Sequence, residues 1–275
     1  MNTTTRPASA IARTRTIRCE CRDSAMWITL DSPETLNSIS PQIIAELQSA
    51  LDDIEADPAV RSIVVTGTGR AFCAGGDLKA VMQLASDTDK DTAGSDFLAS
   101  ISALMSRLER MPLPVIGAIN GIAFAGGLEL ALCCDIVVAA ETATFGDVHS
   151  RYGLLPGGGG SVRLPRKLGV NRAKYLMLTG EQVSAKQMLD WGLCVKVVPA
   201  SELDSVVSEL AASLAEKSAL GLRRMKQMID DGLEQPLDVA LRAELLACEV
   251  HDGSFDRNEG LAAFAERRRP QFRGR

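Results

Sequence analysis

Three short apolar segments, separated by glycine turns and helical patterns, constrain the fold of this chain more than any other feature. They span Ser62 to Thr66, Val115 to Ile119 and Asp135 to Ala139. Short strands that alternate with helices are typical of strand-helix-strand units built around a shared sheet. The sequence therefore predicts an α/β core.

The segments before this core also have clear periodicity. Apolar residues alternate with polar ones from Ile17 to Cys21 and again from Met26 to Leu30, which predicts an antiparallel hairpin. Ser40 and Pro41 then provide an N-cap and a first-turn proline, and apolar residues recur at helical spacing until Asp57. We expect an amphipathic helix between those two points.

After Pro199 the pattern is helical almost throughout, so we divide the chain into three parts. Residues 1–16 are predicted to be a flexible N-terminus, 17–200 the α/β core, and 201–275 a helical C-terminal region. The predicted C-terminal helices are Glu202 to Ala215, Ala219 to Asp231, Pro236 to Val250 and Arg257 to Arg267.

Charge and cysteine content exclude several classes of protein. The net charge is −5, and such an acidic balance disfavours a nucleic-acid surface. Even the apolar run from Pro114 to Ala125 falls short of the roughly 20 residues that span a bilayer. Seven cysteines without a Cys-x-x-Cys pair predict neither a disulfide framework nor a metal site, and fit the reducing cytoplasm. The arginines among residues 1–18 also suit an organelle presequence, but we favour a frayed terminus.

Two glycine-rich segments carry the first indication of chemistry. One runs from Ala71 to Leu78 and the other from Asn120 to Leu130, and each links an apolar strand to a helical pattern. Amides at a helix start lack intrahelical acceptors, so two of them aimed at one point would stabilise an oxyanion. Sequence spacing alone does not establish that the two segments converge.

The residues in and around these segments resemble a known family. Ordered over residues 17–272, six blocks look like the crotonase superfamily of enoyl-CoA hydratases and isomerases, and six matches in order are far more specific than one glycine motif. The blocks are Ala74 to Leu78, Asn120 to Leu130, Cys134 to Ile136, Phe145 to Gly146, Gly153 to Gly159 and Glu259 to Phe264.

The resemblance implies a fold, an assembly and a ligand. The fold is a spiral of β-β-α units, and the C-terminal helices form a homotrimer or a hexamer. The ligand is an acyl-CoA thioester, with no cofactor besides the CoA of the substrate. By position in the family motifs, the two oxyanion-hole amides fall on Ala74 and Gly126. The predicted substrate-binding residues beside them are Gly75, Gly76, Asp77 and Gly127.

The same resemblance assigns Glu129 and His149 as catalytic residues. Glu129 lies three residues after Gly126 and matches a catalytic glutamate of family hydratases, although a first-turn acid also suits a helix cap. At His149 the family hydratases usually carry a second glutamate. Imidazole still exchanges a proton near neutral pH, so we retain His149 in the site. Asp147 and Asp77 are expected to cap a helix or fix a turn.

The predicted reaction is hydration of a 2-enoyl-CoA to a 3-hydroxyacyl-CoA. Three alternatives remain: a double-bond isomerase, a decarboxylase or hydrolase of a β-dicarbonyl thioester, and a catalytically silent acyl-CoA binding protein. Cys73 lacks a neighbouring base and is expected to be a buried thiol rather than a nucleophile. The basic residues Arg166, Lys167, Arg172 and Lys174 are not assigned to the CoA phosphates.

Overall fold

The computed structural model describes residues 15–80, 82 and 90–275, so most of the predicted flexible N-terminus lies outside the described residues. The core contains two sheets. The larger has the order β1-β2-β3-β5-β7-β10, and the smaller has the order β4-β6-β8-β9. The strands are β1 (Ile17–Arg22), β2 (Ala25–Leu30), β3 (Ser62–Gly67), β4 (Ala71–Cys73), β5 (Val115–Ile119), β6 (Ile122–Phe124), β7 (Ile136–Ala140), β8 (Thr144–Gly146), β9 (Val183–Ser184) and β10 (Lys196–Val198).

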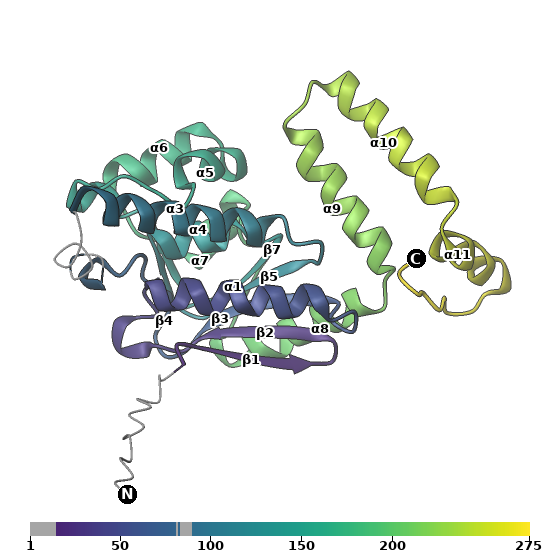
Figure 1. Ribbon diagram of the computed structural model, residues 1–275, viewed down its shortest axis with the longest axis horizontal. Helices are drawn as coiled ribbons and strands as arrows, with labels where there is room; N and C mark the ends of the chain where they lie inside the picture. Colours follow the sequence, from purple (N-terminus) through teal and green to yellow (C-terminus); the bar gives the residue numbers. More distant parts are fainter. Residues whose placement is uncertain (1–14, 81, 83–89) are drawn as a thin grey trace, which may run out of the picture.

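Helices cover these sheets and extend beyond them, as Figure 1 shows. Short 3-10 turns at Pro33–Thr35, His149–Tyr152 and Ala200–Glu202 join some of the elements. The helices are α1 (Pro41–Ala56), α3 (Lys90–Glu109), α4 (Gly126–Leu132), α5 (Gly160–Leu168), α6 (Val170–Thr179), α7 (Ala185–Trp191), α8 (Leu203–Ala215), α9 (Ala219–Leu233), α10 (Leu237–Asp252) and α11 (Phe255–Glu266).

The predicted hairpin, first helix and α/β core are confirmed. β1 pairs with β2 in antiparallel register, while β2, β3, β5, β7 and β10 run parallel. Ser40 caps α1, its Oγ accepting a hydrogen bond from the amide of Ile43 over 3.2 Å. Pro41 is the first residue of the helix. It has no N–H, but an N–H at this position would have had no acceptor within the helix, so no hydrogen bond is lost.

A repeated unit organises the core. β3, β5 and β7 lie in the large sheet, each is followed by a strand of the small sheet, and a helix completes the unit. This is the predicted spiral of β-β-α units. The repeat matters for the site because it places β4, β6 and β8 side by side and parallel. Their carboxyl ends therefore meet at one edge of the small sheet.

The large sheet is buried on both faces. Ile63 and Val65 of β3 point into the main core with α1, α3 and α4, whereas Val64 between them points into a second cluster. This alternation follows from the two-residue period of a strand. In the second cluster Leu203 and Val207 of α8 pack on the sheet, so the first predicted C-terminal helix is part of the core.

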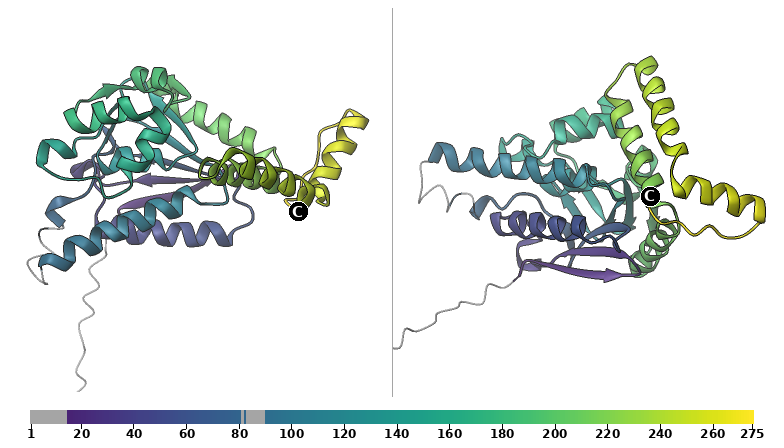
Figure 2. Two further views of the ribbon diagram at one scale, coloured as in Figure 1. Left: turned by 90° about the horizontal axis from the view of Figure 1, so that it is seen from above. Right: turned by 45° about the vertical axis from the view of Figure 1, so that its right-hand side comes forward.

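The remaining C-terminal helices stand apart from the core. Figures 1 and 2 show α9 and α10 as an antiparallel pair that projects from one side, with α11 at the end of the pair opposite the α9-α10 turn. α10 has no buried residue, although it carries leucines and valines. In the part of the chain that the structure describes, no helix is long and apolar enough to cross a bilayer.

Candidate active site

The predicted site residues lie where three strands of the small sheet end. The chain leaves β4 into Ala74 to Asp77, leaves β6 into Ala125 and helix α4, and leaves β8 into Asp147 to His149. Since these strands are parallel neighbours, their carboxyl ends share an edge, which is where open α/β sheets bind ligands. Three segments that are separate in the sequence, beginning at Ala74, Ala125 and Asp147, are thereby brought to one place.

The two glycine segments converge, which the sequence could not establish. A Cβ added to Gly75 would lie 3.3 Å from the amide nitrogen of Gly126, and one added to Gly126 would lie 3.3 Å from Cα of Gly75. A Cβ on Gly127 would lie 1.9 Å from the carbonyl oxygen of Cys73, so that position accepts only glycine. Ala125, which precedes α4, has a φ of 49°, a strained value for a residue with a side chain.

The assignment of Ala74 as an oxyanion donor needs correction. Its amide donates to the carbonyl oxygen of Leu36 over 3.0 Å, so this N–H is not available to a ligand. Two residues on, the amide of Gly76 has no acceptor within the described chain, and neither does that of Gly126. Asp77 accepts hydrogen bonds at Oδ1 from the amides of Lys79 and Ala80, as a capping residue does.

Glu129 is a buried carboxylate held by the backbone. It lies in the first turn of α4 with only 2% of its surface exposed. Its Oε1 accepts a hydrogen bond from the amide of Gly160 over 2.7 Å. Burial disfavours the charged form and raises the pKa of Glu129; the Gly160 hydrogen bond and the charge of His149 oppose this shift without cancelling it.

His149 forms a pair with Asp147. Its Nδ1 lies 2.8 Å from Oδ1 of Asp147, which is itself almost fully buried. Burial lowers the pKa of His149, but the hydrogen bond and charge of Asp147, together with the charge of Glu129, outweigh burial and raise the pKa above 6.5. A proton on Nδ1 leaves Nε2 as the ring atom for exchange with a ligand.

The glycine tract at 157–160 encloses the Glu129 carboxylate, a role that the sequence did not reveal. A Cβ on Gly158 would lie 2.7 Å from Oε2 of Glu129, and one on Gly160 would lie 3.1 Å from Oε1. The same Cβ on Gly160 would lie 3.3 Å from Oδ2 of Asp147. The tract thus places the carboxylates of Glu129 and Asp147 against one stretch of backbone.

Comparison with known proteins identifies the family of the chain. Residues 20–275 match the sequence model of the enoyl-CoA hydratase/isomerase family. The chain belongs to that family. The predicted resemblance to the crotonase superfamily is therefore confirmed, over almost the whole chain.

The names of its relatives include both hydratases and isomerases. This chain is 39% identical over 256 residues to the 1,2-epoxyphenylacetyl-CoA isomerase of Escherichia coli (strain K12), and the match covers 91% of this chain and 95% of that protein. It is 35% identical over 257 residues to the enoyl-CoA isomerase/hydratase fer4 of Mycosarcoma maydis, covering 90% and 92%. The crystal structure of an enoyl-CoA hydratase from Bacillus anthracis, 36% identical, superposes with a TM-score of 0.89 over 94% of this chain and 100% of that one.

Cys73 lies next to the candidate active site, but its environment does not suit a nucleophile. Its side chain is fully buried, and burial raises the pKa of the thiol to about 12. A thiol with such a pKa stays protonated near neutral pH, and the thiolate is the reactive form. The prediction of a buried, unreactive thiol agrees with this environment.

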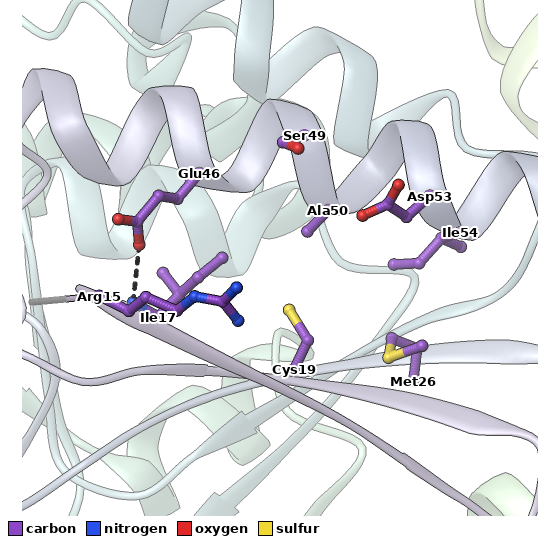
Figure 3. Close-up of a pocket in the computed structure, with 9 residues that line it drawn as sticks. All are labelled: Arg15, Ile17, Cys19, Met26, Glu46, Ser49, Ala50, Asp53 and Ile54. Carbon is purple, nitrogen blue, oxygen red and sulfur yellow. Dashed lines mark hydrogen bonds between the residues drawn. The ribbon is translucent and has the colours of Figure 1, made fainter. Parts of the chain in front are cut away.

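A separate cavity of about 290 Å³ lies between α1 and the β1-β2 hairpin (Figure 3). Its walls include Cys19 and Met26 from the hairpin and Asp53 from α1. Glu46 closes one end, where it accepts a hydrogen bond from the amide of Ile17 over 3.1 Å. None of the predicted catalytic residues lines this cavity, so it is distinct from the candidate active site.

Proposed function

We propose that the protein adds water to a 2-enoyl-CoA thioester and forms a 3-hydroxyacyl-CoA. The observation that carries this proposal is the position of Glu129 and the Asp147–His149 pair at the same sheet edge as the amides of Gly76 and Gly126, which have no acceptor among the described residues. Family membership supports a CoA thioester as the substrate.

The two amides would bind the thioester carbonyl oxygen. Negative charge develops on that oxygen when a nucleophile adds to C3, and two fixed N–H donors stabilise it more in the transition state than in the ground state. The corrected pair is Gly76 and Gly126. The reaction is redox neutral and the thioester accepts the electron pair, so the proposed chemistry uses no cofactor.

Glu129 and His149 would exchange the protons. The Glu129 carboxylate takes a proton from water as the oxygen bonds to C3, and the electrons of the C2–C3 double bond move into an enolate. Protonated His149 gives a proton to C2, which reforms the carbonyl. Each group stabilises the other's charged form, because the charge of His149 lowers the pKa of Glu129 and that of Glu129 raises the pKa of His149.

Double-bond isomerisation is the second candidate. One relative of this chain is named as an enoyl-CoA isomerase/hydratase, and a single residue that takes a proton from one carbon and returns it to another would suffice. In that reaction Glu129 would move a proton between C2 and C4 of the enolate. Isomerisation needs only Glu129, so the presence of His149 in place of a second carboxylate does not exclude it.

The test is loss of enoyl-thioester absorbance with crotonyl-CoA and a longer 2-enoyl-CoA, with products identified by mass. Glu129→Gln and His149→Ala should abolish turnover without unfolding the protein. His251→Ala is the matched control, since His251 contacts Arg224 on the C-terminal helices and lies outside the site. A product of unchanged mass would favour the isomerase, turnover of a malonyl-type thioester would favour the decarboxylase or hydrolase, and tight binding without turnover would favour a silent binder.

A further inference from the structure

Arg163 is a nearly buried cation beside the active site that the proposed chemistry does not use. It lies in α5, and only 12% of its side chain is exposed. Its Nε and Nη2 donate to the carboxylate of Glu109 over 2.7 to 3.0 Å, and Nη2 also reaches Oγ of Ser106 at 3.4 Å. Its Nη1 donates to the carbonyl oxygen of Gly158 over 2.7 Å.

The guanidinium therefore joins α3 to the glycine tract that encloses Glu129. Gly158 and Gly160 contact the carboxylate of Glu129, and Arg163 holds the carbonyl of Gly158 from the other side. A planar guanidinium can fix two acceptors at once because its donors form a rigid fork. A change in the direction of the Gly158 carbonyl would rotate the peptides that follow it, including the amide bound to Glu129.

Gly159 shows how closely the tract fits Arg163. Its φ is 97°, and a Cβ there would lie 1.9 Å from Nη1 of Arg163. The left-handed backbone at position 159 favours glycine, and a side chain there would displace the guanidinium from its present place.

Helix α3, which Arg163 contacts through Glu109, also packs against other residues of the site. Besides Glu109, this helix places Ile101 against Gly158, with Cγ2 3.2 Å from an added Cβ, and Phe97 against Gly76 at 3.6 Å. The glycine tract, α3 and one oxyanion donor thus form a continuous packed unit. Arg163 joins α3 to the glycine tract by hydrogen bonds to Glu109 and to the carbonyl oxygen of Gly158.

We infer that Arg163 is a positioning residue, which orients the Glu129 carboxylate through the Gly158–Gly160 backbone. It touches neither the substrate nor the reacting atoms. The inference rests on the proposed role of Glu129. Glu109 holds the guanidinium of Arg163 in place by accepting its hydrogen bonds.

The test replaces Arg163 and follows Glu129 itself. Arg163→Met removes the charge and the fork, and Arg163→Lys keeps the charge but cannot span both acceptors. Arg166→Met is the matched control, because Arg166 lies in the same helix and pairs with exposed Glu234. We expect Arg163→Met to lower kcat by about 10- to 100-fold with little change in KM, since small errors in placing a catalytic group have effects of this size. Arg163→Lys should recover part of that loss, and Arg166→Met should change neither constant.

A second readout does not depend on turnover. In protein labelled with ¹³C at glutamate Cδ, the Glu129 signal is identified by its loss in Glu129→Gln. Its pKa should rise in Arg163→Met because a nearby positive charge is lost, and the acidic limb of the kcat/KM profile should move to higher pH with it. An unchanged Glu129 titration and unchanged kcat would overturn the inference. A shifted titration in a protein that turns over no enoyl-CoA would retain the role of Arg163 and reject the proposed reaction.

Discussion

Gly160 donates its amide hydrogen to Oε1 of Glu129 over 2.7 Å, and this bond links two segments 31 residues apart in the sequence. The amide of Gly158 is a second backbone donor to the same carboxylate, and an added Cβ on either glycine would crowd its oxygens. The carboxylate of the proposed base is thus held by backbone amides of the glycine tract. Changes in the glycine tract should therefore affect catalysis directly.

The first prediction concerns Gly158→Ala. The new methyl group would lie 2.7 Å from Oε2 of Glu129, so the carboxylate or the tract must move. We expect kcat to fall by about tenfold or more, because the proposed base is displaced. Unfolding free energy should fall by about 1–3 kcal/mol, as is usual when a packed site is overfilled. Steady-state kinetics and urea unfolding measure the two effects.

Gly253→Ala is the control for this substitution. Gly253 has a φ of −78° and no atom within 4 Å of an added Cβ, so alanine fits there without strain. Its kinetics should match those of the wild type. Wild-type kcat in Gly158→Ala would show that the carboxylate tolerates displacement and would contradict the prediction.

The second prediction concerns Asp147→Asn, which keeps the shape and a hydrogen-bond acceptor but removes the charge. The pKa of His149 should fall, because its hydrogen bond to the carboxylate and that negative charge raise it in the wild type. Since the sequence has only two histidines, their NMR signals are assigned with a single His251→Ala variant. The limb of the pH–rate profile that reports on protonated His149 should move to lower pH.

The same pair makes stability depend on pH. Because the pKa of His149 is raised in the folded state, its contribution to the free energy of unfolding is fully present below pH 6.5 and is lost as pH rises through the raised value. Urea unfolding across this range should show a smaller pH dependence in Asp147→Asn than in the wild type. An equal dependence in both proteins would exclude Asp147 as the partner that sets the His149 titration.

The third prediction tests the amide of Gly76 as the oxyanion donor of the first glycine turn. An ester bond in place of the amide at Gly76 removes its N–H, although it also weakens the Gly75 carbonyl as acceptor for the amide of Ile39. Loss of an oxyanion donor costs about 10²- to 10³-fold in kcat. An ester at Gly75 is the control, since its N–H makes only a 3.5 Å contact with Sγ of Cys73. Retained kcat with the ester at Gly76 would return the assignment to another donor.

The sequence was sufficient to predict the secondary-structure elements, but not to identify both oxyanion-hole amides. A short apolar run located β3, and helical spacing located α1 and the C-terminal helices, because these patterns arise within one segment. Whether Ala74 or Gly76 has a free amide depends on the carbonyl of Leu36, which belongs to another segment. Likewise, no local pattern in the glycine tract indicates its contact with Glu129, because that contact forms only in the folded chain.

The last prediction concerns the apolar surface of the C-terminal helices. Leu233 of α9, Leu245 of α10 and Phe264 of α11 are 76%, 64% and 86% exposed, and α10 buries no residue. An amphipathic helix is stable when its apolar side is covered, and clustered exposed leucines mark an interface. We expect a second and third copy of this chain to cover these residues, as the family resemblance predicts.

Mass photometry should accordingly give three or six times the chain mass of 29.3 kDa. Leu245→Asp would place a charge in the interface and should shift the population to smaller species, because an unpaired buried charge is costly. Ser205→Asp adds the same charge on the exposed side of α8 and should leave the assembly unchanged. A wild-type protein that remains monomeric at micromolar concentration would show that α9, α10 and α11 are stable with their apolar side chains in water.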